Sequence, residues 1–373
     1  MKQKLKIALF SHSLVSDWNH GNAHFLRGLM RELVRMGHRV RCYEELGSWS
    51  LTHLMKREGE RAIEAIDSFR RIYPELDIRF YKSGDDQFQQ FLDEELKETH
   101  LVLLHEWNDP HVVNSVLALK QKHGFIALFH DSHHRAYTNA GEILKFHLHL
   151  VDGVLAFGEA IRRIYVDGFG ISRAWTFHEA ADIEQFRPLR RRKSIDMVWI
   201  GNWGDDERTQ EVEEFLIGPA AAIPGIRAVV HGVRYPDTAV QKLKDANVEY
   251  RGYLPNLLSP QVYAESYVTL HIPRRQYANG LAGIPTIRVF EALACGIPLV
   301  CSPWHDEEGL FRPGQDYAMV RNGQEMAAEL RHLLDDAKAR HQLAENGLKA
   351  VRERHTCTHR AHELVSIYEE IAG

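Results

Sequence analysis

The chain has 373 residues, of which 44% are hydrophobic and 26% charged, so it is long enough for two globular domains and too apolar to be disordered. Its 46 basic and 51 acidic residues leave a net charge of 46 − 51 = −5, which argues against a protein that works mainly by neutralising nucleic-acid phosphates. No run approaches the roughly 20 apolar residues that a membrane-spanning helix needs. The four cysteines form no CxxC pair, so we expect no zinc site or disulfide framework, and a cytoplasmic protein.

Strands and helices alternate along the first half of the chain. We expect a strand at 6–11, because the run Ile7–Phe10 is too short for the apolar core of a signal peptide. Residues 22–36 repeat apolar side chains at helical spacing, and Gly37 follows where a helix commonly ends. Further strands are expected at 39–43, 77–81, 101–104, 125–129, 154–157 and 174–177. Near-continuous apolar strands between helices predict a parallel sheet that is covered on both faces.

The same alternation restarts after residues 186–194, FRPLRRRKS, which we interpret as a solvated linker. Strands are then expected at 197–200, 228–231, 249–252, 268–272, 299–301 and 317–320, with a closing helix near 361–371. The pattern predicts two doubly wound α/β domains, at 1–187 and 195–356. In such folds ligands bind beyond the carboxyl ends of the strands, which here means a cleft between the domains.

The most informative segment is 283–298, GIPTIRVFEALACGIP. Thr286 is a plausible N-cap for a helix that is apolar except for Arg288 and Glu291. A buried carboxylate needs a partner, which for Glu291 is either Arg288 three residues earlier or the hydroxyl pair of a ribose. The helix start at Thr286 and Ile287 offers backbone N–H groups that suit a phosphate. The residues alone leave nucleotide binding and a structural ion pair equally open.

This segment resembles the nucleotide-sugar-binding run of GT-B-fold glycosyltransferases of the group 1 type, most closely the CgeB-like branch. Other segments, in matching order, are similar to the same family: 21–40 with its opening Gly21, 129–132 (FHDS), 151–161, 178–188 and 251–255 (RGYLP). The resemblance implies a GT-B fold of two Rossmann-like domains. It also implies that residues 357–373 form a helix that packs back on the N-terminal domain, and that Tyr253 and Leu254 lie near the nucleobase.

The sequence departs from the family pattern at two places. Retaining members carry a glutamate eight residues before the position of Glu291, where this chain has Gly283. The family's arginine–lysine pair after the first strand of the second domain is also missing, and GNWGDDERT (201–209) stands there instead. We expect Asn202 and Arg208 from that segment, together with Arg274 and Arg275, to contact the nucleotide diphosphate in its place.

The acceptor side of the reaction is expected at strand ends of the first domain. The resemblance places His130 beside the reacting sugar carbon, with Asp131 next to it. We also expect His12 and His20 to help present the acceptor. Glu106 follows another strand and is a candidate general base, although a helix-capping or structural role fits its position better. Trp18, in the loop after the first strand, is either a platform for a sugar ring or simply packed.

We therefore expect a glycosyltransferase that moves a sugar from a UDP-, GDP- or other nucleotide-activated donor to a hydroxyl. The resemblance favours retention of configuration, which Gly283 leaves open. The acceptor could be a glycan, lipid, protein, small molecule or modified nucleic acid. We expect no cofactor beyond the donor and no metal ion, because arginines and a helix start can balance the phosphate charge. The alternatives are a nucleotide-sugar epimerase on the same fold and a non-catalytic nucleotide-sugar-binding paralogue.

Overall fold

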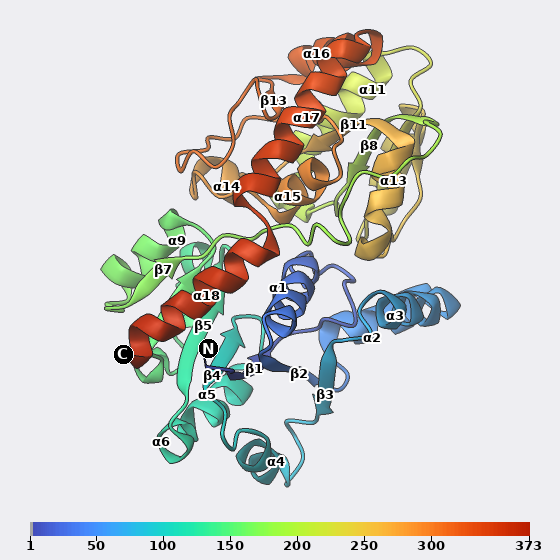
Figure 1. The fold of residues 1–373 in the computed structure, drawn as a ribbon. Helices are drawn as coiled ribbons and strands as arrows, with labels where there is room; N and C mark the ends of the chain where they lie inside the picture. Colours follow the sequence, from blue (N-terminus) through green and yellow to red (C-terminus); the bar gives the residue numbers. More distant parts are fainter. Residues whose placement is uncertain (1–2) are drawn as a thin grey trace. The chain divides into compact units, whose positions relative to one another are not determined.

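The computed structural model describes residues 3–373 (Figure 1). Contacts divide the chain into two compact units. Unit 1 comprises residues 1–179 and 357–373, and unit 2 comprises residues 180–356. Each unit is an α/β structure built on one parallel sheet, so the predicted fold class, two Rossmann-like doubly wound halves, is confirmed.

The sheet of unit 1 has the strand order β3-β2-β1-β4-β5-β6-β7, and all its neighbouring strands are parallel. Its strands are β1 (Lys6–Phe10), β2 (Arg39–Glu45), β3 (Asp77–Tyr81), β4 (Leu101–His105), β5 (Ile126–Asp131), β6 (Gly153–Ala156) and β7 (Ala174–Thr176). The order reverses between β1 and β4, which is where ligands bind in doubly wound sheets. The carboxyl ends of β1, β4 and β5 therefore lie next to the point where a ligand is expected to bind.

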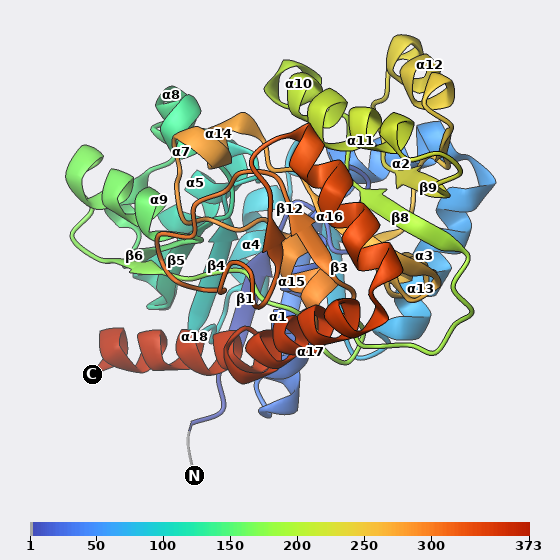
Figure 2. The same cartoon turned by 90° about the horizontal axis from the view of Figure 1, so that it is seen from above.

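Helices of unit 1 cover this sheet, and their apolar faces form its core. They are α1 (Ala23–Arg35), α2 (Trp49–Glu58), α3 (Glu60–Ile72), α4 (Phe88–Glu95), α5 (Pro110–Ala118), α6 (Lys120–His123), α7 (Arg135–Thr138), α8 (Ala140–Ile143), α9 (Glu159–Arg163) and α18 (Cys357–Ala372). Gly37 follows α1 with φ +89°, which is the left-handed conformation expected after a helix end. The last helix, α18, contacts α1 and β5 although more than 200 residues separate it from them in the chain (Figure 2).

Unit 2 repeats the architecture with the strand order β10-β9-β8-β11-β12-β13. The strands are β8 (Ile195–Ile200), β9 (Ala228–His231), β10 (Val248–Tyr250), β11 (Ser266–His271), β12 (Leu299–Cys301) and β13 (Ala318–Met319). The helices are α10 (Thr209–Val212), α11 (Gly218–Ala222), α12 (Asp237–Asp245), α13 (Ser259–Glu265), α14 (Arg275–Asn279), α15 (Ile287–Ala294), α16 (Gly323–Asp335) and α17 (Ala337–Arg354). Among the described residues, no helix has the length and apolarity that a bilayer crossing requires.

Candidate functional site

Histidine rings line the strand ends of unit 1. His105 and His130 are register partners on β4 and β5, and their ring centroids lie 5.4 Å apart. His20, in the loop after β1, lies 6.0 Å from His105 and 5.4 Å from His12. The parallel register of three strands thus brings together side chains that are far apart in sequence. We call His12, His20, His105 and His130 the histidine row.

The histidine row is uncharged at neutral pH. Burial lowers the pKa of His12 and of His130 to about 4, and it lowers those of His20 and His105 as well. His130 is 2% exposed, and its Nε2 has no hydrogen-bond partner within the described part of the chain. A buried, uncharged ring nitrogen without a partner is suited to a ligand hydroxyl.

The loop that carries His12 and His20 is held by buried charges. Glu44 on β2 accepts hydrogen bonds from the N–H groups of Leu14 and Val15, at 2.5 and 3.3 Å. From α1, Arg27 donates to the Leu14 carbonyl at 2.6 Å and to Asp17 at 3.0 Å. Gly21 lies in the same loop, just before α1. These contacts fix the loop against the sheet edge.

Two predicted acids of unit 1 have partners. Glu106, fully buried, receives hydrogen bonds from Arg135, whose guanidinium also lies 4.2 Å from the Trp107 ring centroid. Asp131 accepts from the Tyr165 hydroxyl at 2.7 Å and from the His133 N–H at 2.9 Å. Burial raises the pKa of Glu106 to about 8 and that of Asp131 to about 6. A proton on Glu106 near neutral pH is therefore compatible with its surroundings.

In unit 2, α15 carries the predicted nucleotide residues. Glu291 is fully buried, and Arg288 forms an ion pair with one of its carboxylate oxygens. The other oxygen accepts from Asn256 Nδ2 at 2.6 Å. The ion pair that the sequence left open is therefore present, and ribose binding by Glu291 stays a prediction.

Thr286 stands at the predicted N-cap of α15 but does not cap the helix with its side chain. Thr286 occupies the N-cap position, but its side chain makes no cap hydrogen bond. Its hydroxyl instead lies 3.1 Å from Nε2 of His271, the last residue of β11. The first N–H groups of a helix have no partner within the helix, so those at Ile287 and Arg288 are candidates for a phosphate.

Three further predicted cations lie near the ends of β8 and β11. Arg274 pairs with Glu207, and Arg275 pairs with Glu211 at 2.9 Å. Arg208 donates to the carbonyls of Ile272 and Asn202. Burial, followed by the charge of Arg274, lowers the pKa of Arg208 to about 10, so it keeps its charge at neutral pH. Arg208 is thus a half-buried cation whose side-chain hydrogen bonds go to backbone carbonyls.

The remaining predicted nucleotide residues lie in turns after β8 and β10. The side-chain oxygen of Asn202 accepts from the Val233 N–H at 2.9 Å, which joins the turns after β8 and β9. Tyr253 and Leu254 are half-buried and follow Gly252, which has φ +69°. The structure thus places all three near the carboxyl edge of the unit 2 sheet, the edge at which doubly wound sheets bind ligands, and their contact with a nucleotide stays a prediction.

Gly283 has a backbone reason to be glycine. Its φ is +91°, and a Cβ there would lie 3.2 Å from Cγ of Glu308. A glutamate at this position would be strained, because non-glycine residues disfavour positive φ. Glycine at this position therefore fits both the left-handed backbone and the close approach of Glu307 and Glu308.

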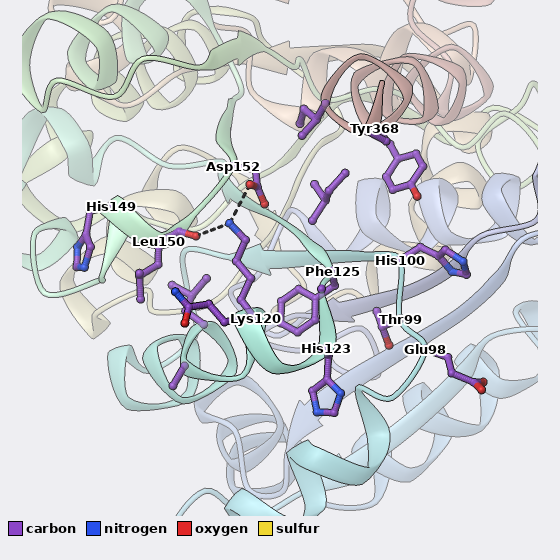
Figure 3. A pocket seen from close by; sticks show the side chains of 17 residues that line it. Glu98, Thr99, His100, Lys120, His123, Phe125, His149, Leu150, Asp152 and Tyr368 are labelled. Atoms are coloured by element: carbon purple, nitrogen blue, oxygen red, sulfur yellow. Dashed lines mark hydrogen bonds and ion pairs between the residues drawn. The ribbon is translucent and has the colours of Figure 1, made fainter.

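A large hollow in unit 1 lies at the opposite edge of the sheet, by the amino ends of β4, β5 and β6. Its volume is about 1240 Å³, and Tyr368 of α18 contributes to its wall (Figure 3). Lys120 within it donates to Asp152 and to the Leu150 carbonyl, both at 2.8 Å. Because doubly wound sheets bind ligands at the other edge, we do not assign this hollow to the reaction.

Several residues that contact the predicted site residues of the two units were not identified from the sequence. Asn256, Arg135 and Trp107 contact the predicted acids or histidines, yet none stands in a recognisable motif. His271 could have been identified, because it ends an apolar strand as His130 does. Among the side chains the structure describes, no group of three or more His, Cys, Asp or Glu is placed to hold a metal ion.

Comparisons with known proteins agree with this arrangement. Residues 207–366 match a family described as "Glycosyl transferase-like". No curated protein matches the sequence. Among solved structures, a glycosyltransferase from Rickettsia africae ESF-5 is similar over 99% of both chains, with 11% identity and a TM-score of 0.67. Sucrose-phosphate synthase from Thermosynechococcus elongatus has a TM-score of 0.66 and 14% identity over 99% of both chains.

The Anabaena protein HepE, solved with UDP-glucose, has a TM-score of 0.67 and 12% identity, and covers 98% of this chain and 100% of its own. At these identities the likeness establishes the fold. The fold is thus that of GT-B glycosyltransferases, and residues 207–366 match a glycosyl transferase-like family, in agreement with the resemblance to the group 1 type that the sequence predicted. The chain's membership of the CgeB-like branch stays a prediction.

Proposed function

We propose that this protein transfers a sugar from a nucleoside-diphosphate sugar to an acceptor hydroxyl, with unit 2 binding the nucleotide and unit 1 the acceptor. In the reaction the bond between the sugar carbon and the diphosphate breaks, a bond to the acceptor oxygen forms, and the acceptor loses its proton. We expect configuration to be retained, and we expect no metal ion or further cofactor to be required.

The donor assignment is carried by one observation, the buried carboxylate of Glu291 on a helix whose first N–H groups face the carboxyl edge of a parallel sheet. A carboxylate has lone pairs beyond those used by Arg288 and Asn256, which suits the two hydroxyls of a ribose. A diphosphate then suits the start of α15, beside Thr286 and Ile287. UDP is the first nucleotide to test, because HepE was solved with UDP-glucose.

The leaving diphosphate gains negative charge in the transition state. Arg208 is suited to offset that charge, because it is half-buried and its hydrogen bonds go to backbone carbonyls rather than to a carboxylate. Arg274 and Arg275 would have to share their charge with Glu207 and Glu211. We therefore rank Arg208 above the other two as the stabilising cation.

The acceptor hydroxyl is proposed to bind beside His130. Its unpartnered Nε2 can accept the hydroxyl proton. Asp131 is engaged by Tyr165, and Glu106 is held by Arg135 through Oε2, although its Oε1 has no partner in the described part of the chain. Asp131 and Glu106 then act as supports for the strand ends around His130. A reducing compartment such as the cytoplasm fits the four cysteines, all of which are buried and none of which forms a disulfide in the described chain.

A thermal-shift screen against nucleotide sugars tests the donor assignment. A ligand at 100 times its dissociation constant should stabilise the protein by about 2.7 kcal/mol. Sugar release or transfer is then measured with the binding donor, first without and then with candidate acceptors. Absence of any nucleotide-sugar binding contradicts the proposal. Isomerised donor without an acceptor would indicate an epimerase, and binding without turnover a non-catalytic paralogue.

A further inference from the structure

An exposed aromatic surface lies at the same edge of unit 1 as the histidine row. Trp49 opens α2 and is 44% exposed, whereas Trp18 behind it is 4% exposed. Their ring centroids lie 5.3 Å apart, and the ring of His53 lies 4.3 Å from Trp49 and 5.2 Å from Trp18. We call Trp18, Trp49 and His53 the ring trio. Trp18 is thus packed, His53 is half-buried, and Trp49 is the most exposed member of the trio.

Several hydrogen bonds hold the ring trio in place. The Trp18 indole N–H donates to Glu58 at 3.3 Å, and its carbonyl accepts from the Ser50 hydroxyl at 2.9 Å. His53 Nδ1 lies 2.8 Å from the Trp49 carbonyl, so Nδ1 is the protonated nitrogen and Nε2 is left as an acceptor. A ring held in this way loses little conformational entropy when a ligand covers it.

The ring trio is continuous with the histidine row. The N–H of Ser50, the residue after Trp49, donates to His12 Nε2 at 3.3 Å. His12 in turn lies 5.4 Å from His20 and 6.5 Å from Trp107. Ser50 therefore links the exposed Trp49 to His12 of the histidine row, where the acceptor hydroxyl is proposed to bind.

We infer that Trp49 is the stacking surface of an acceptor subsite, and that the acceptor presents a sugar ring to it. This inference rests on the proposed function. A pyranose has an apolar face of C–H groups that packs on an indole, and hydroxyls at its rim that need acceptors. His53 Nε2 and the second carboxylate oxygen of Glu58 supply such acceptors next to the trio. An acyl chain would gain nothing from these two polar groups, so the arrangement favours a carbohydrate.

The test is a titration of the full chain with methyl glycosides, followed by NMR of the tryptophan indole N–H signals. The chain has seven tryptophans, and loss of one signal in Trp49→Phe assigns Trp49. Methyl glycosides of glucose, galactose, mannose, rhamnose and N-acetylglucosamine serve as probes. We expect at least one of them to shift the Trp49 signal saturably, in the millimolar range.

Because both Trp49 variants lack that signal, binding to them is followed through the indole N–H of Trp18, whose ring lies 5.3 Å from that of Trp49. Trp49→Ala should weaken binding at least tenfold, while Trp49→Phe should retain most of it because a ring remains. Met55→Ala is the matched control, because Met55 is 47% exposed on the same helix and lies outside the trio. It should leave saccharide binding unchanged. Affinity for UDP, measured on the same samples by calorimetry, should be the same in all three variants.

The inference is overturned if no glycoside shifts the Trp49 signal, or if Trp49→Ala binds the glycosides as well as the wild type. It is also overturned if phosphatidylcholine vesicles shift that signal and glycosides do not, since the acceptor side would then be apolar. Any of these three results, if UDP binding is intact, leaves the proposed donor reaction standing. A wild-type protein that binds no nucleotide sugar instead contradicts the proposed function itself.

Discussion

Replacing Glu291 by glutamine separates its two possible roles. Glutamine keeps one acceptor oxygen, which can still receive the Asn256 amide, but it loses the ion pair with Arg288. Because Arg288 is 27% exposed, the loss should cost about 1–2 kcal/mol, less than the 3–5 kcal/mol typical of a fully buried pair. Structural and ligand-binding roles both predict this destabilisation, so stability alone does not decide between them.

The preference for UDP over 2′-deoxy-UDP does distinguish the two roles of Glu291. Hydrogen bonds to a charged acceptor contribute about 1.5–3 kcal/mol and neutral ones about 0.5–1.5 kcal/mol. If Glu291 accepts ribose hydroxyls, Glu291→Gln should weaken UDP binding by about tenfold, or about 1.4 kcal/mol. The wild type should also prefer UDP to 2′-deoxy-UDP, and the variant should lose most of that preference. Calorimetry at a temperature where the variant is folded measures all four affinities.

The matched control is Glu325→Gln, which removes another arginine–glutamate pair of unit 2, the one between Glu325 on α16 and Arg321 just before that helix. It should leave both affinities and their ratio unchanged. An equal preference for UDP over 2′-deoxy-UDP in wild type and Glu291→Gln would refute the ribose role. Glu291 would then serve only to pair with Arg288.

Four further outcomes are expected. Gly283→Ala should lower the melting temperature more than Gly309→Ala, because both residues have positive φ but only Gly283 has neighbours within 4 Å of an added Cβ; equal shifts would contradict this reading. Transfer should persist in excess EDTA, and loss of activity that magnesium or manganese restores would contradict the metal-free mechanism. His130→Ala should lower kcat about 100-fold, or about 2.7 kcal/mol, with UDP affinity unchanged, and a stable variant with wild-type turnover would exclude His130 from the mechanism. Burial raises the pKa of Glu44 to about 7, so the stability of the folded protein should fall as pH rises from the unfolded pKa near 4.5 through 7. Glu44→Gln should flatten that part of a profile of melting temperature against pH. An unaltered slope would show that Glu44 does not titrate in this range.

The strands and their parallel arrangement could be predicted because buried strands leave an apolar run in the sequence. The expected strand at 101–104 is β4, for example, and the helix expected at 22–36 is α1 at Ala23–Arg35. The grouping of His105 with His130 also follows from the sequence, since parallel register brings strand ends together. Pattern and sheet geometry suffice for these features.

Side-chain partners could not be predicted in the same way. Arg274 pairs with Glu207, which is 67 residues away, and no periodicity connects the two. Trp18 and Trp49 both follow strands, and only the packed structure shows which of them is exposed. Local charge patterns identify pairs such as Arg288 and Glu291, but pairs between distant segments depend on tertiary contacts.

The nesting of unit 2 within the chain of unit 1 constrains the order of folding during synthesis. Ala361, Leu364 and Val365 of α18 are buried, and the sulfur of Cys357 lies against the Phe25 carbonyl of α1. Residues 180–356 are translated before any of these side chains exists. On the ribosome, unit 2 can therefore complete its core first, while the apolar surface of α1 that α18 covers stays open and is a site where a chaperone can bind the nascent chain.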